Sequence, residues 1–215
     1  YEMNGKDLIE SFQLSSKINR IIGSIPPNNL TYELFLDEKG EKISKSIGNG
    51  ISVDEWLEFS PKESLELFMF QAPKRAKKLY FDSIPKSTDE FIKLKNDYKN
   101  LNLEDKMNNP CWFLDFKESE NIPQGLTFNM ILNLASVCKA ENSEILWGFI
   151  EKYYPTLEKK NSIFLAELLE FGVKYYKRFI VPFKVYRKPN ALEYKGFTLL
   201  VEMLDSLKGN ETAEE

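Results

Sequence analysis

Hydrophobic residues recur every three or four positions along most of this chain, which predicts a mainly helical protein. We expect helices within residues 8–22, 53–58, 61–71, 85–98, 126–138, 142–155, 163–181 and 190–209. Two short runs rich in aromatic and aliphatic residues, 30–37 and 78–82, predict strands. The expected fold class is therefore mainly α with a small α+β part.

Capping patterns mark the start of three of these helices. Segments 52–55 (SVDE) and 60–63 (SPKE) each place a serine three residues before a glutamate, and the second has a proline at its first expected helical position. Segment 190–193 (NALE) resembles another capping box. We expect a helix to begin directly after each capping residue.

The composition excludes several kinds of chemistry. The 215 residues contain no histidine, and the two cysteines, Cys111 and Cys138, are too few for a structural zinc site. We expect both thiols to be reduced and buried, as in a cytoplasmic protein. Trp56, Trp112 and Trp147 lie in apolar surroundings, which predicts core positions.

Charge and length narrow the class of protein further. The net charge of -4 argues against a chain coated with nucleic acid, although it does not describe local patches. No apolar run approaches the roughly 20 residues that cross a bilayer, so we expect no membrane partner. The chain opens with Tyr1 and shows no secretory leader pattern, and we expect it to be a fragment of a longer protein.

The loop at 38–50 (EKGEKISKSIGNG) is the strongest candidate for chemistry. It holds three glycines, two serines and three lysines with almost nothing apolar, which predicts a long, polar and mobile segment. Lysines, hydroxyls and unhindered backbone N–H groups are what a polyphosphate requires. The alternative is a solvated hairpin loop.

Two basic segments are candidates for nucleic-acid contact. Residues 174–195 contain seven lysines and arginines against one acid, Glu193, and are interleaved with six aromatic residues. That mixture contacts phosphates and stacks on unpaired bases, whereas the alternative is an amphipathic helix with its aromatics inward. A smaller basic cluster lies at 74–78, and there the alternative is a solvated helix end.

The run from Tyr32 to Ser46, followed by 48–50 (GNG), resembles the KMSKS region of class I aminoacyl-tRNA synthetases, and more narrowly the class I lysyl-tRNA synthetases of archaea and some bacteria. Similar segments are 5–8 (GKDL), 54–57 (DEWL), 61–65 (PKESL), 76–82 (AKKLYFD), 89–91 (DEF) and, more weakly, 133–135 (NLA) and 146–150 (LWGFI). Ile43 replaces the motif's methionine, and Ile47 stands where a lysine is expected. The family's HIGH-type signature needs histidines, so the resemblance places the first half of the Rossmann domain, with most of the lysine pocket, upstream of Tyr1.

The resemblance also implies a domain plan and an activity. Residues 1–29 would end a class I Rossmann catalytic domain, 30–99 would form a stem-contact fold bearing the KMSKS loop, and 100–215 would form an all-helical anticodon-binding domain. The activity implied is the activation of L-lysine by ATP in the presence of Mg²⁺, followed by attachment of the lysine to tRNA(Lys). No DNA partner and no metal held by this chain are implied, and the isolated chain is expected to be inactive.

Residue roles follow from the same resemblance. Lys45 would stabilise charge on the ATP phosphates with help from Lys42, and Ser44 and Ser46 would donate hydrogen bonds. Gly5 and Asp7 look like the Gly-x-Asp segment that meets the nucleotide, the alternative being a turn in which Asp7 caps a helix. The residues implied to lie near tRNA are Arg178, Arg187, Lys188, Lys77 and Lys78.

Two other functions remain open from the sequence. A class I synthetase for another amino acid shares the loop and the mechanism. A non-catalytic RNA-binding module derived from a synthetase would keep the basic segments without the activity.

Overall fold

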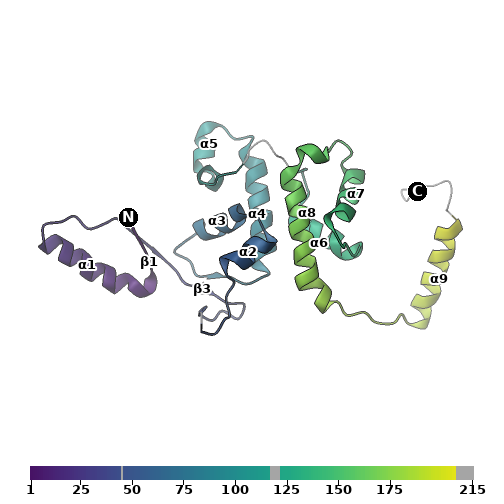
Figure 1. Ribbon diagram of the computed structural model, residues 1–215, viewed down its shortest axis with the longest axis horizontal. Helices are drawn as coiled ribbons and strands as arrows, with labels where there is room; N and C mark the ends of the chain where they lie inside the picture. Colours follow the sequence, from purple (N-terminus) through teal and green to yellow (C-terminus); the bar gives the residue numbers. More distant parts are fainter. Residues whose placement is uncertain (45, 117–121, 207–215) are drawn as a thin grey trace. The chain divides into compact units, whose positions relative to one another are not determined.

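The computed structural model describes residues 1–44, 46–116 and 122–206. The chain forms two compact units, residues 1–181 and residues 182–215. Its strands are β1 (Glu2–Gly5), β2 (Asn29–Tyr32), β3 (Phe35–Leu36) and β4 (Lys77–Lys78). Its α-helices are α1 (Ile9–Ile21), α2 (Val53–Phe59), α3 (Lys62–Phe70), α4 (Ser83–Tyr98), α5 (Leu103–Asn108), α6 (Phe128–Val137), α7 (Ser143–Tyr153), α8 (Ile163–Tyr175) and α9 (Ala191–Ser206) (Figure 1). The described part of the chain is therefore mainly helical, as the hydrophobic pattern predicts.

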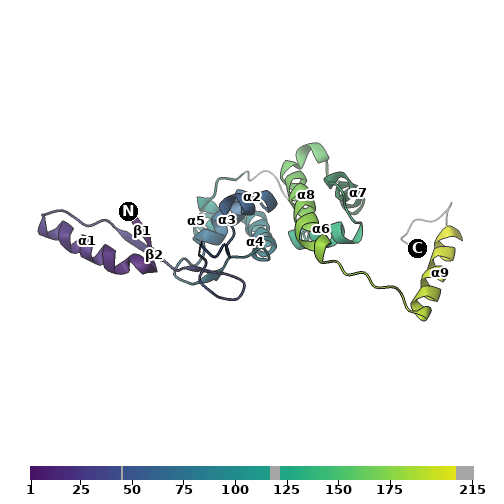
Figure 2. The ribbon, with the colours of Figure 1, turned by 60° about the horizontal axis from the view of Figure 1, so that its bottom comes forward.

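The N-terminal segment is a strand, a helix and a second strand. β1 and β2 pair in parallel, with Glu2 opposite Asn29 and Gly5 opposite Tyr32 (Figure 2). Parallel neighbours need a crossover connection, and α1 with the short 3₁₀-helix η1 (Lys6–Leu8) supplies it. The helix is confirmed. β1 was not expected from the sequence, because four residues with no apolar alternation carry little strand signal.

The two expected strands are shorter than the sequence predicts. The run 30–37 breaks at Glu33, whose N–H donates to the Pro73 carbonyl, so β2 and β3 belong to different sheets. β3 instead pairs in parallel with β4. Beyond β4 the chain turns towards α4, and the Ser83 N–H closes this turn on the Tyr80 carbonyl at 2.9 Å. The prediction of single strands over 30–37 and 78–82 is therefore wrong beyond these short pairings.

Two of the three capping predictions are confirmed. Ser52 and Glu55 form a complete capping box at the start of α2. At α9 the Glu193 N–H donates to Asn190 Oδ1, and the Asn190 N–H donates to the Glu193 carboxylate, each at 2.9 Å. Both arrangements satisfy backbone N–H groups that would otherwise lack a partner at the helix start.

The third capping prediction is wrong, because Ser60 is used in the core. Its hydroxyl shares hydrogen bonds of 2.6 Å with the hydroxyls of Ser64 and Thr88, and Pro61 precedes α3 without a side-chain cap. Trp56 Nε1 donates to Ser64 Oγ at 3.0 Å. These polar groups are fully buried, so their mutual hydrogen bonds offset the loss of water.

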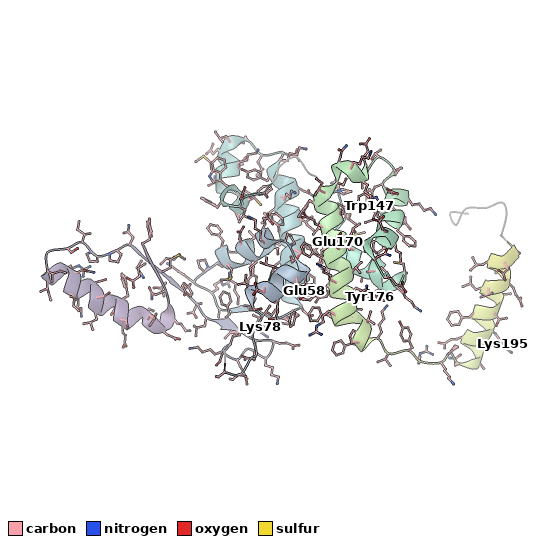
Figure 3. The ribbon with its side chains drawn as sticks, viewed as in Figure 1. Glu58, Lys78, Trp147, Glu170, Tyr176 and Lys195 are labelled. Carbon is pink, nitrogen blue, oxygen red and sulfur yellow. The ribbon has the colours of Figure 1, made fainter. Side chains whose placement is uncertain are left out.

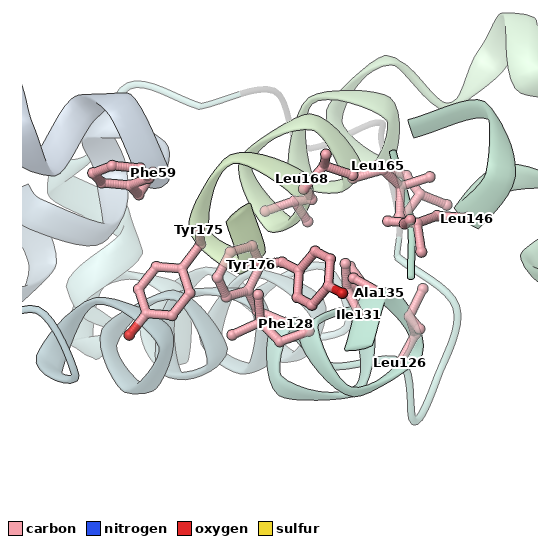
Figure 4. Packing of buried hydrophobic residues seen from close by; sticks show 14 of the residues in the cluster. Phe59, Leu126, Phe128, Ile131, Ala135, Leu146, Leu165, Leu168, Tyr175 and Tyr176 are labelled. Atoms are coloured by element: carbon pink, nitrogen blue, oxygen red, sulfur yellow. The ribbon is translucent and has the colours of Figure 1, made fainter. Parts of the chain in front are cut away.

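The main core gathers side chains from α2, α4, α6, α7 and α8 (Figure 4). Tyr175 lies at its centre, with its ring centroid 6.1 Å from that of Phe59 and 6.5 Å from that of Phe128. Its hydroxyl donates to Asp82 at 3.3 Å, and burial together with this carboxylate raises the pKa of Tyr175. A smaller cluster joins α3, α4 and the 3₁₀-helix η2 (Pro110–Phe113) through Leu67, Phe91, Tyr98 and Cys111.

The tryptophan and cysteine predictions are confirmed in part. Trp56 and Trp147 are 1% and 3% exposed, whereas Trp112 is 43% exposed and does not belong to the core. The single turn of η2 directs Cys111 inward, and its neighbour Trp112 therefore faces outward. Cys111 and Cys138 are both free thiols, the first buried and the second half-buried.

The helix expected over 163–181 is α8, which continues as the π-helix η4 (Tyr176–Ile180) and then as the 3₁₀-helix η5 (Val181–Phe183). Another 3₁₀-helix, η3 (Lys159–Asn161), precedes α8. In the second unit, α9 carries many exposed apolar side chains, including Leu199, Leu200 and Leu204. Its expected end at Gly209 lies outside the described residues. None of the helices in residues 1–44, 46–116 and 122–206 is both long and apolar enough to cross a membrane.

Candidate functional site

The loop between β3 and α2 is built by turns rather than left open. An antiparallel bridge joins Leu36 to Lys42, and Gly40 and Gly48 have φ angles of +88° and +68°, which suit glycine. Gly50 packs against Ile43 so closely that a Cβ at position 50 would lie 2.5 Å from the Ile43 Cγ2. The described part of the loop is therefore hydrogen-bonded and tightly turned, and the mobility expected from the sequence stays a prediction.

The base of this loop is held by Asp37 and Asn49, which lie in the segments that carry the family resemblance but were assigned no role from the sequence. Asp37 Oδ1 accepts the Glu41 N–H at 2.8 Å, and Asp37 Oδ2 accepts the Asn49 side-chain amide at 2.8 Å. These two hydrogen bonds hold the pKa of Asp37 below its ordinary value. The sequence signals were the place of both residues in the segments that resemble the KMSKS region and the position of Asn49 between two glycines.

The residues implied to meet ATP come from two separate segments. The Lys42 Nζ lies 2.7 Å from Asp7 Oδ2 in an exposed ion pair, although the two residues are 35 positions apart. A second pair of 2.8 Å joins Lys6 to Glu33, and this contact lowers the pKa of Glu33. Together the pairs bring η1 against the segment that leads into the loop. Asp7 does not act as the cap of α1, because that helix has no side-chain cap.

The other implied site residues on this face are placed as follows. Gly5 ends β1 beside Tyr32, whose ring would lie 3.6 Å from a Cβ at position 5. The hydroxyls of Ser44 and Ser46 are 2.8 Å apart. Lys45, implied to act on the phosphates, lies outside the described residues.

Lys77 and Lys78 are both engaged with backbone carbonyls. Lys77 Nζ donates to the carbonyls of Phe68 and Met69 at the C-terminal end of α3, where a cation interacts favourably with the helix dipole. Burial lowers the pKa of this amine. Lys78 Nζ donates to the Glu38 carbonyl at 2.9 Å, so this residue ties β4 to the loop (Figure 3).

The basic aromatic segment 174–195 divides between the two units. Arg178 is exposed on η4 in the first unit, whereas Arg187 and Lys188 are exposed in the second. Arg187 donates to both oxygens of Glu193 at 2.7 and 2.6 Å, which raises the pKa of Arg187 and lowers that of Glu193. These cations therefore belong to two separate units of the chain.

The aromatic residues of the same segment divide in the same way. Tyr175 and Tyr176 are each 4% exposed and belong to the core, as the amphipathic alternative predicts. Phe183, Tyr186 and Tyr194 are exposed, as a stacking surface requires. The amphipathic alternative is thus confirmed for Tyr175 and Tyr176, and contact of this segment with nucleic acid stays a prediction.

The described part of the chain has no cluster of potential metal ligands. Within residues 1–44, 46–116 and 122–206, no three histidine, cysteine, aspartate or glutamate side chains are grouped so that they could hold a metal ion.

Comparison with known protein families identifies the family of this chain. Residues 1–117 match the family described as "tRNA synthetases class I (K)". The chain belongs to this family. The match includes the loop, β1 and η1, and therefore both sides of the Lys42–Asp7 contact.

Curated relatives extend the similarity beyond residue 117. The lysine–tRNA ligase of Rickettsia bellii (strain OSU 85-389) is 45% identical over 217 residues, covering 97% of this chain and 40% of the relative. The lysine–tRNA ligase of Rickettsia felis is 44% identical over 222 residues, covering 100% of this chain and 41% of the relative. That of Roseobacter denitrificans is 43% identical over 209 residues, covering 97% and 40% respectively. The chain thus spans about two fifths of the length of these lysine–tRNA ligases.

Proposed function

We propose that this chain is the C-terminal, loop-bearing part of a lysine–tRNA ligase, which activates L-lysine with ATP and attaches it to tRNA(Lys). The observation that carries the proposal is the 2.7 Å contact between Lys42 of the KISKS loop (residues 38–50, with the KISKS motif at 42–46) and Asp7 of η1, which directly follows β1. It brings together two segments that the family resemblance assigns to ATP. The similarity to lysine–tRNA ligases over 97% of the chain supports lysine as the amino acid.

The chemistry of this reaction explains why a loop lysine matters. The lysine carboxylate attacks the α-phosphorus of ATP, the bond to the bridging oxygen breaks, and pyrophosphate leaves with the added negative charge. Cations and hydroxyl donors that meet this charge stabilise the transition state more than the ground state. We assign that role to Lys42 and Lys45, with Ser44 and Ser46 as hydrogen-bond donors.

ATP and Mg²⁺ enter this proposal as the nucleotide substrate and the ion that accompanies its phosphates. Because the described residues hold no cluster of three metal-ligating side chains, we assign no step to a metal bound by this chain. Asp7 can accept hydrogen bonds from ribose hydroxyls once Lys42 has turned to the phosphates. Gly5 leaves space for the nucleotide beside β1.

We further propose the division into domains that the resemblance implies. Residues 1–29, with the parallel β1–α1–β2 unit, would end a Rossmann catalytic domain, because parallel strands joined by a helix are its building block. Residues 30–99 would form the stem-contact fold, and residues 100–215 the helical anticodon-binding domain. We propose a cytoplasmic location, where tRNA is charged.

The proposed tRNA surface rests on exposed cations. Arg178, Arg187 and Lys188 are exposed, and Arg187 would have to exchange Glu193 for a phosphate. Lys77 and Lys78 are occupied by backbone carbonyls, so we give them a supporting role beside the loop.

The direct test is to charge tRNA with the complete protein encoded by the gene. We expect radioactive lysine, ATP and Mg²⁺ to yield lysyl-tRNA(Lys), and the purified 215-residue chain alone to yield none. The other standard amino acids serve as controls. Charging with a different amino acid would replace lysine in the proposal, and tRNA binding without charging by the complete protein would favour the non-catalytic RNA-binding module.

A further inference from the structure

Asp37 and Asn49 close the KISKS loop at its base. Asp37 follows β3 directly and is only 8% exposed, so its carboxylate is enclosed where the loop begins. It accepts the Glu41 N–H and the Asn49 side-chain amide, each at 2.8 Å. The backbone repeats the first of these links, because the Asp37 N–H donates to the Glu41 carbonyl at 2.8 Å.

Asn49 carries this anchorage into the KISKS motif itself. Its Oδ1 accepts the Ser44 N–H at 3.0 Å, while its Nδ2 is held by Asp37 and also lies 3.4 Å from the Lys42 carbonyl. One amide side chain therefore links the buried carboxylate to the backbone at two motif positions. An amide suits this place because it donates and accepts at the same time.

The consequence concerns the direction of two reacting side chains. If the backbone at Lys42 and Ser44 were free, both side chains would have to be ordered during each reaction cycle, and that entropy would add to the barrier. We propose that Asp37 and Asn49 are positioning residues. They hold the backbone of Lys42 and Ser44 so that both side chains are directed at the phosphates of ATP. This inference rests on the proposed function.

Variants that reverse the hydrogen bond between the two side chains test whether this bond positions Lys42 and Ser44. Two single variants break the bond, and the double variant restores it in the opposite direction. Asn49→Asp places two carboxylates together, and Asp37→Asn places two amide donors together. In the double variant, the new amide at position 37 can donate to the new carboxylate at position 49 and can accept from the Glu41 N–H. The carboxylate at position 49 can still accept from the Ser44 N–H. Three of the four native links are thus available again, and the 3.4 Å contact between the residue 49 side chain and the Lys42 carbonyl is the one that is lost.

The experiment measures lysine-dependent exchange between ATP and pyrophosphate in the complete protein. We expect each single variant to lower kcat by about 10- to 100-fold, because small misplacements of reacting groups cost that much, with little change in the KM for lysine. The double variant should recover to within about threefold of the wild type. Asn100→Asp, which adds the same charge at an exposed position after α4, is the matched control and should leave kcat unchanged.

Amide hydrogen exchange at Ser44 and Glu41 supplies a second readout that does not depend on catalysis. Protection should fall in both single variants and return in the double variant. This inference would be overturned, and the proposed function left intact, if the wild type were active and the single variants kept its kcat. The same holds if the kcat of the double variant were no higher than that of the worse single variant. A wild type without exchange for any amino acid would overturn the proposed function and the catalytic part of this inference together.

Discussion

Lys42 is held by an interaction that is easily given up. Its ion pair with Asp7 joins side chains that are 58% and 53% exposed, and pairs of this kind contribute about 0–1 kcal/mol to stability. The lysine can therefore leave the aspartate for a phosphate group at small cost. The same exchange frees the Asp7 carboxylate for another partner.

The pKa of Asp37 gives a prediction at this scale. Hydrogen bonds from Asn49 and from the Glu41 N–H lower it in the folded chain, so the folded state favours the ionised carboxylate. The resulting stabilisation is complete above the ordinary aspartate pKa of about 3.9 and is lost as the pH falls through the lower folded value. We expect protection of the Glu41 amide to fall over that range.

The Asp37→Asn variant is the control for this pH effect, because residue 37 then has no proton to take up. Its Glu41 amide should show weaker protection at neutral pH and no comparable loss on acidification. Loss of protection at the same pH in both proteins would assign the effect to another group.

Individual residues show where sequence reasoning stops. The lysines and glycines of the loop were visible as a pattern, and the contact between Lys42 and Asp7 was not, because nothing in the sequence fixes a pairing over 35 positions. Asn49 was missed because a single amide between glycines resembles any turn. Trp112 was placed in the core by its apolar neighbours, whereas the local turn of η2 directs it outward.

The packing of α6 against α8 depends on one glycine. A Cβ at position 172 would lie 2.6 Å from the Ile131 Cγ2, so a larger residue requires the Ile131 side chain or one of the two helices to shift. Overpacking of this kind costs about 1–3 kcal/mol. We expect Gly172→Ala to lower the free energy of unfolding, measured by urea denaturation, despite the better helix propensity of alanine.

Gly148 in α7 is the matched control, because a Cβ there would meet nothing within 4 Å. Gly148→Ala should raise the free energy of unfolding by about 0.5–1 kcal/mol through helix propensity alone. Equal effects of the two substitutions would contradict the close approach of α6 and α8.

At the level of elements, local signals were readable in the sequence and tertiary ones were not. The capping boxes at α2 and α9 act within four residues and could therefore be predicted. Ser60 carries the same local pattern, but Ser64 and Thr88 compete for its hydroxyl inside the core. The strand run at 30–37 was divided by a distant carbonyl, that of Pro73, which no local pattern predicts.

For the whole molecule, the family match covers the segments that we propose to meet ATP. The matched residues 1–117 contain β1, η1 and the loop, whereas the similarity to the lysine–tRNA ligase relatives also covers most of the chain beyond residue 117. The chain covers about two fifths of those relatives, so the complete activity is a property we propose for the complete protein. The second unit, with α9 and the exposed Tyr194, belongs to the proposed tRNA surface.

The measurement that tests the central claim most directly is lysine-dependent ATP–pyrophosphate exchange by the complete protein and its Lys42→Ala variant. Lys39→Ala, which removes another lysine of the same loop outside the motif, is the control. We expect exchange with lysine in the wild type, a loss of about 10²- to 10³-fold in kcat for Lys42→Ala, and near wild-type exchange for Lys39→Ala. Equal activity of all three proteins would contradict the account, because the loop would then carry no role in the reaction on ATP.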